Sequence, residues 1–196
     1  MTFIKKRYYV FLVCIAIILG VSHAFAADDG LSFDKKLEGK YIIVYYPAVP
    51  DMARHLTEQL NIRPSDKISA GQPLKCKDTC EEELAQMLDT LFIQVSDILE
   101  MHLYSLKINI KVFKNNTELS DIYSRLFKSS LDGKSSFYAS DFNSIYVSED
   151  GFKSGIIGHE MSHAIICHYF PTPVPIKVQE LLAMYVEYTL RCIDQQ

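Results

Sequence analysis

Clusters of basic residues are missing from most of this sequence. Lys5, Lys6 and Arg7 form one near the start, and no comparable group of Lys and Arg follows. The whole chain has 20 basic and 24 acidic residues; without residues 1–26, which hold three of the basic ones, 17 remain against 24. A net charge near −7 with no basic patch argues against nucleic acid as a partner.

Internal repeats and low-complexity tracts are also missing, and so is a second close pair of cysteines beside Cys76 and Cys80. Without that second pair, "CKDTC" favours a short disulfide loop over a zinc knuckle. Cys167 and Cys192 lie on two separate predicted helices, so a second bridge between them stays open. An even number of cysteines after residue 26 fits an oxidising compartment.

The N-terminal segment has the order of a secretory signal peptide. Lys5–Arg7 is followed by an apolar run from Tyr8 to Val21 and by the small residues around Ala24-Phe25-Ala26. The run is shorter than the roughly 20 apolar residues of a membrane span and is broken by Gly20. We therefore predict a signal peptide over 1–26 and an exported protein, periplasmic or secreted, without a stable membrane anchor after cleavage.

Residues 27–196 have the length of one domain, and their hydrophobic pattern alternates between strand and helix periods. Strands are predicted at 40–47, at 105–114 and as a pair within 135–148, and residues 27–40 are consistent with a mobile polar lead-in. Helices are predicted at 51–62, from Thr79 to about 103, at 117–129, from about 155 to 170, and at 177–193. This order predicts an α+β fold with a small, mostly antiparallel sheet.

The helix at 155–170 carries charged and polar groups within an apolar run. "GHEMSH" places His159 and His163 one turn apart on one face with Glu160 beside them, whereas His168 falls on the opposite side. This is the H-E-x-x-H arrangement, in which two imidazoles bind one zinc ion and the carboxylate reaches a metal-bound water. The competing interpretation is a set of core histidines satisfied by local hydrogen bonds.

A hydrolytic zinc site needs a third protein ligand. His168 is excluded because it lies on the opposite face of the helix. The continuation H-x-x-G-x-x-H, which would supply a third histidine, is not present, because Ile166 stands at its glycine position and Tyr169 at its second histidine position. Glu180 is the first acidic residue downstream, on a helix that is expected to pack antiparallel to the histidine helix. Glu180 is therefore a candidate third ligand for one Zn²⁺ held by His159 and His163.

"GHEMSH" followed by "VQELLAMYVEY" resembles the gluzincin metallopeptidases, the group that includes thermolysin, and especially small peptidase MA-like proteins. The resemblance covers about residues 136–193 and implies a zincin-like fold, with His159, His163 and Glu180 as zinc ligands and Glu160 as general base. It also implies that the strand pair before the helix is a sheet edge for substrate backbones. The activity implied is hydrolysis of peptide bonds in peptide or protein substrates.

The chain departs from that pattern after Glu180. Leu181 stands where the family commonly has glycine, and Met184 stands where thermolysin-like members place an acidic residue that orients a histidine. Glu187, two turns beyond Glu180, is either a substitute or a solvated surface residue. A non-catalytic exported zinc-binding protein is therefore the alternative. A donor for the oxyanion stays open among Tyr138, Tyr146, Tyr185 and Tyr188.

Overall fold

The computed structural model describes residues 28–60, 62 and 80–193. The predicted signal peptide lies outside these ranges. Strands and helices are the following: β1 (Lys35–Glu38), β2 (Ile42–Tyr46), α2 (Met52–Leu60), α3 (Cys80–Leu99), β3 (Ile108–Phe113), α4 (Asn116–Phe127), β4 (Ser136–Ala139), β5 (Ser144–Ser148), α5 (Ser154–Tyr169) and α6 (Ile176–Ile193), with 3₁₀ turns at Ser140–Phe142 and Glu149–Gly151. The α+β class is confirmed.

The five strands form one sheet in the order β1-β2-β3-β5-β4. β1 with β2 and β4 with β5 pair antiparallel, whereas β2 with β3 and β3 with β5 pair parallel. The prediction of a mostly antiparallel sheet is therefore wrong, because the sheet is mixed. A parallel pair needs a long connection, and here α2 and α3 supply the one between β2 and β3.

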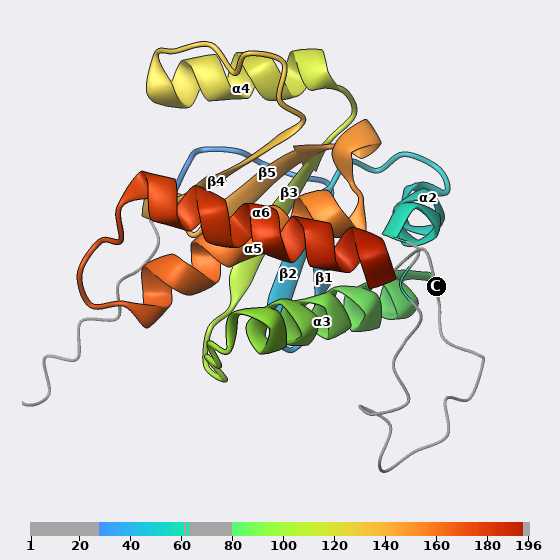
Figure 1. Cartoon of the computed structure of the whole chain (residues 1–196). Helices are drawn as coiled ribbons and strands as arrows, with labels where there is room; N and C mark the ends of the chain where they lie inside the picture. Colours follow the sequence, from blue (N-terminus) through green and yellow to red (C-terminus); the bar gives the residue numbers. More distant parts are fainter. Residues whose placement is uncertain (1–27, 61, 63–79, 194–196) are drawn as a thin grey trace, which may run out of the picture.

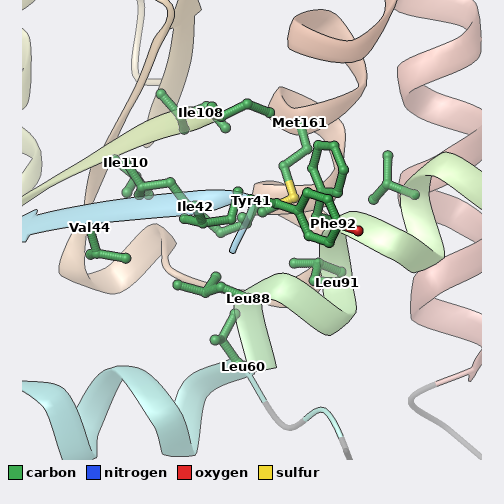
Figure 2. Packing of buried hydrophobic residues seen from close by; sticks show 14 of the residues in the cluster. Tyr41, Ile42, Val44, Leu60, Leu88, Leu91, Phe92, Ile108, Ile110 and Met161 are labelled. Carbon is green, nitrogen blue, oxygen red and sulfur yellow. The ribbon is translucent and has the colours of Figure 1, made fainter. Parts of the chain in front are cut away.

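The main core lies between one face of the sheet and the helices α3 and α5. Alternate residues of the central strands point into it, among them Ile42, Val44, Ile108 and Ile110, and they meet the buried stripe of α3 (Figure 2). This is the alternation expected of strands with one buried face. α3 ends at Leu99, earlier than predicted, because Glu100 adopts a left-handed conformation (φ 55°) that a helix cannot continue.

The opposite face of the sheet is covered by α4 and by the segment at residues 28–33, with α4 on the other side of the sheet from α3 (Figure 1). Asp29 accepts hydrogen bonds from Lys111 and from the buried Tyr146 on this face. The described part of the polar lead-in is thus attached to the sheet, and its residues Lys35–Glu38 form the edge strand β1. No helix in the described part of the chain is long and apolar enough to cross a membrane.

Candidate metal centre

Two histidines of α5 point the same way into a cleft. His159 and His163 are four residues apart, so their side chains lie one above the other on the helix, and their Nε2 atoms are 3.3 Å apart. The neighbouring positions Met161, Ala164 and Ile165 are fully buried and fix this face outward from the core. The shared face predicted from spacing is confirmed.

The third group comes from α6, which packs antiparallel against α5 in front of the sheet (Figure 1). Glu180 Oε2 lies 3.5 Å from His159 Nε2, and Glu180 Oε1 lies 3.5 Å from His163 Nε2. The helices approach closely at Gly158, where an added Cβ would stand 2.2 Å from Leu190 Cδ1. Glycine at this position therefore lets α6 bring its carboxylate within reach of both imidazoles.

The other nitrogen of each ring is held by an acceptor on α6. His159 Nδ1 lies 3.1 Å from Glu187 Oε2, and His163 Nδ1 lies 3.3 Å from Gln179 Oε1. Gln179 Nε2 donates to Val174 O at 2.8 Å, which fixes the side-chain amide with its oxygen toward the histidine. Because a carboxylate and an amide oxygen only accept, each Nδ1 carries the proton.

This arrangement sets the electrostatics of the cluster. A neutral imidazole with its proton on Nδ1 presents a lone pair at Nε2. In the neutral form of the two rings, two such lone pairs and the Glu180 carboxylate face one another across 3.3–3.5 Å. The donor set of two imidazoles and one carboxylate is therefore suited to a cation at its centre.

Glu160 lies beside the cluster in a different environment. Its side chain is 8% exposed, and Oε1 accepts a hydrogen bond of 2.7 Å from the hydroxyl of Ser136, the first residue of β4. Burial raises the pKa of the Glu160 carboxyl, while the hydrogen bond from Ser136 acts in the opposite direction. Ser136 thus holds one carboxylate oxygen in place.

The cluster opens into a cleft of about 380 Å³ between α4, β4, α5 and α6. His159, Glu160, His163 and Glu180 all line it. A larger hollow of about 620 Å³ lies beside α2 and has no histidine among its lining residues. The four polar residues predicted from the sequence therefore line the same cleft.

The four tyrosines left open as oxyanion donors occupy different places. Tyr138 lines the cleft and donates its hydroxyl to Asn143 Oδ1 at 3.3 Å. Tyr146 is buried on the opposite face of the sheet with Asp29, which removes it from the site. Tyr185 and Tyr188 are 57% and 69% exposed on the outer side of α6. Only Tyr138 among the four shares the cleft with Glu160.

His168 lies away from the cluster, as its helical phase predicts, and its Nδ1 contacts Ala164 O at 2.9 Å. Cys76 lies outside the described residues, so the predicted loop disulfide with Cys80 is not described. Cys167 and Cys192 are free. Cys167 lies beside Gln179 near the start of α6, and Cys192 near its end, roughly 20 Å along the helix axis. Antiparallel packing therefore excludes a bridge between them.

Sequence reasoning did not identify Gln179 and Ser136. Gln179 immediately precedes Glu180, so its position was available once α6 was known to face α5. Ser136 is a single serine at a strand start, which no spacing distinguishes from any other. Comparison with known proteins adds no assignment: no family model, no curated protein and no solved structure matches this chain.

Proposed function

We propose that this protein is an exported zinc-dependent peptidase in which His159, His163 and Glu180 bind one Zn²⁺ and Glu160 is the general base. The observation that carries the proposal is the spacing of the three donors. Zinc binds imidazole nitrogen and carboxylate oxygen at about 2.0–2.2 Å, so the corners of a tetrahedron around it are about 3.3–3.6 Å apart. His159 Nε2 lies 3.3 Å from His163 Nε2 and 3.5 Å from Glu180 Oε2, which matches two of these edges, and the other carboxylate oxygen, Glu180 Oε1, lies 3.5 Å from His163 Nε2.

The partners of the rings support the same donor set. Metal-binding histidines usually donate their second N–H to a carboxylate or carbonyl, which fixes the tautomer. Glu187 and Gln179 are in position to do this for His159 and His163. Glu187 thereby supplies the acidic partner that Met184 does not, and this favours an active enzyme over the alternative of a non-catalytic zinc-binding protein.

Three protein donors leave the fourth position of a tetrahedral zinc open, as in hydrolytic sites. Bound there, zinc would polarise a peptide carbonyl and lower the pKa of a water molecule. Glu160 is well placed to handle the proton. With Oε1 occupied by Ser136, Oε2 takes a proton from the attacking water and passes it to the leaving amine.

The test begins with the metal content of the purified mature protein, residues 27–196, after exhaustive dialysis. We expect one zinc per chain and cleavage of unfolded protein substrates, both removed by a chelator and restored by zinc. A ratio near zero that zinc addition does not change would overturn the proposal. One zinc per chain without any hydrolysis would leave the non-catalytic zinc-binding protein as the function.

A further inference from the structure

One wall of the cleft is aromatic. Tyr123 and Phe127 of α4 and Phe137 of β4 all line it. The ring centroid of Tyr123 lies 4.9 Å from that of Phe127 and 4.9 Å from that of Phe137. Phe127 nevertheless keeps 42% of its surface exposed. A packed aromatic cluster with an uncovered face inside a cleft is a ready surface for another apolar side chain.

The backbone beside this wall is the outer edge of β4, the last strand in the sheet order. Ser148 N donates to Ser135 O at 3.0 Å, and Phe137 is paired with Tyr146. Hydrogen-bonded and non-bonded pairs alternate along antiparallel strands. Ser136 and Tyr138 therefore turn their backbone N–H and C=O groups toward the outer edge, where the described sheet has no further strand.

The side chains of β4 alternate between the two faces of the sheet. Ser136 points to Glu160 on α5, whereas Phe137 points to Tyr123 on α4. A peptide that adds to this edge as a sixth strand would share the same alternation. The peptide residue opposite Phe137 would direct its side chain onto Tyr123 and Phe127, and the residues on either side of it would face α5.

We propose that the cleft selects extended peptides with a large apolar side chain, aromatic or aliphatic, at the position opposite Phe137, and that Tyr123 and Phe127 form the subsite. The identification of the bound peptide as a substrate rests on the proposed function. Its physical content, apolar selection by a strand-binding edge, is independent of the metal. Binding and metal content can therefore be tested separately.

The chain contains no tryptophan, so Phe127→Trp introduces a single indole into the subsite. The probes are acetylated, amidated octapeptides Thr-Ala-Thr-Xaa-Thr-Ala-Thr-Lys with Phe, Leu, Ala or Asp at Xaa. They are titrated into Phe127→Trp in the Glu160→Gln background, zinc-loaded and metal-free, with indole fluorescence as the readout. We expect the Phe and Leu peptides to shift the emission and to bind about tenfold or more tightly than the Ala peptide.

Calorimetry on variants that keep the chain free of indole completes the test. Phe127→Ala and Tyr123→Ala should each reduce the preference for Phe over Ala at Xaa, and because Phe127 is 42% exposed its variant should remain folded. Tyr104→Ala, 78% exposed and outside the cleft, is the matched control and should bind as the parent does. Equal binding of the Phe and Ala peptides, or an unchanged preference in Phe127→Ala, would overturn the subsite.

The two proposals fail separately. Apolar selection without zinc binding would sustain the subsite and remove the peptidase. Zinc-dependent hydrolysis with no preference at Xaa would sustain the peptidase and remove the subsite. An indole shift caused by a chitin tetrasaccharide and by none of the peptides would assign the aromatic wall to sugar rings, and the peptide subsite would be wrong.

Discussion

Glu187 Oε2 accepts a hydrogen bond from His159 Nδ1 at 3.1 Å, while Nε2 of the same ring faces Glu180. Two carboxylates that are seven residues apart on α6 therefore contact opposite edges of one imidazole. Their backbone positions are about 10 Å apart along the helix, and their side chains reach the ring of His159 from opposite sides. Met184, at the intervening turn, is 60% exposed and has no carboxylate to accept a hydrogen bond from His159.

Removal of Glu180 should lower zinc affinity more than removal of a residue that only contacts one of the ligands. We expect Glu180→Ala to lower zinc affinity by more than about 100-fold, since losses outside the ligand set typically cost 10–100-fold. Competition with a chromogenic chelator measures the affinity. Glu83→Ala, an exposed glutamate of α3, is the control and should bind as wild type does. Equal affinities for the two variants would remove Glu180 from the ligand set.

Substitution of Glu187 tests the orientation of His159. We expect Glu187→Gln to lower zinc affinity by about 10–100-fold, because the ring loses a charged acceptor at Nδ1. Arg191 pairs with the other oxygen of Glu187 but is 61% exposed, so Arg191→Gln should cost about fivefold or less. The same chelator competition measures the zinc affinity of both variants. If both variants bind equally, Glu187 acts only as a surface ion pair.

Glu160 should matter for hydrolysis and not for the metal. Glu160→Gln is expected to retain one zinc per chain and to lose about 10²–10⁴-fold in turnover, the range of general-base catalysis. Ser136→Ala, which removes the hydroxyl on Oε1 and leaves the carboxylate, should lose less. Cleavage rates on one protein substrate with metal content measured in parallel give the answer. Wild-type turnover in Glu160→Gln would exclude it as the base.

The close approach of α5 and α6 at Gly158 makes a stability prediction. Gly158→Ala should lower the free energy of unfolding by about 1–3 kcal/mol, because its Cβ meets Leu190 Cδ1 at 2.2 Å. Leu190→Ala in the same chain removes the clash, so the two substitutions should cost less together than the sum of each alone. Urea unfolding of the two single variants and the double variant measures this coupling. Strict additivity would mean that the helices separate freely here.

Asp29 links stability to acid pH. Burial alone raises its pKa, but hydrogen bonds from Lys111 and Tyr146 outweigh it and hold the pKa below the ordinary 3.8. A carboxyl whose pKa is lowered by folding stabilises the fold at pH values above its pKa in the unfolded chain. This stabilisation is lost as the pH falls through the pKa of the folded protein. Asp29→Asn should therefore cost about 1–3 kcal/mol at pH 7, with the difference from wild type narrowing below pH 3.8. Urea unfolding at several pH values tests this, and a pH-independent difference would contradict it.

Helical spacing predicted the orientation of α5, because a period of 3.6 residues fixes which side chains share a face before any packing is known. Glu180 could be proposed for the same reason, once a proline-containing turn implied that α6 returns along α5. The place of Glu187 could not be predicted, because it depends on how far one helix is displaced along the other. That displacement is set by contacts such as Gly158 with Leu190.

The sheet was harder to predict. The alternation of Ile108 and Ile110 identifies a strand but not its neighbour, and the parallel pairing with β2 joins residues far apart in sequence. β1 reads Lys-Lys-Leu-Glu, which has no strand composition. It forms because an edge strand with exposed side chains needs only one backbone partner. Ser136 was missed for a related reason, since its role arises only when β4 meets α5.

The helical hairpin of α5 and α6 also has a consequence for how the chain folds. The contacts of His159 and His163 with α6 join residues 16 to 28 positions apart, whereas pairing of β2 with β3 brings Ile42 to Ile108 across 66 positions. The entropy lost in closing a loop grows with its length, and non-local strand pairing is slow. We expect the rate-limiting search in folding to occur at the centre of the sheet, so that mutations in the hairpin chiefly alter the unfolding rate.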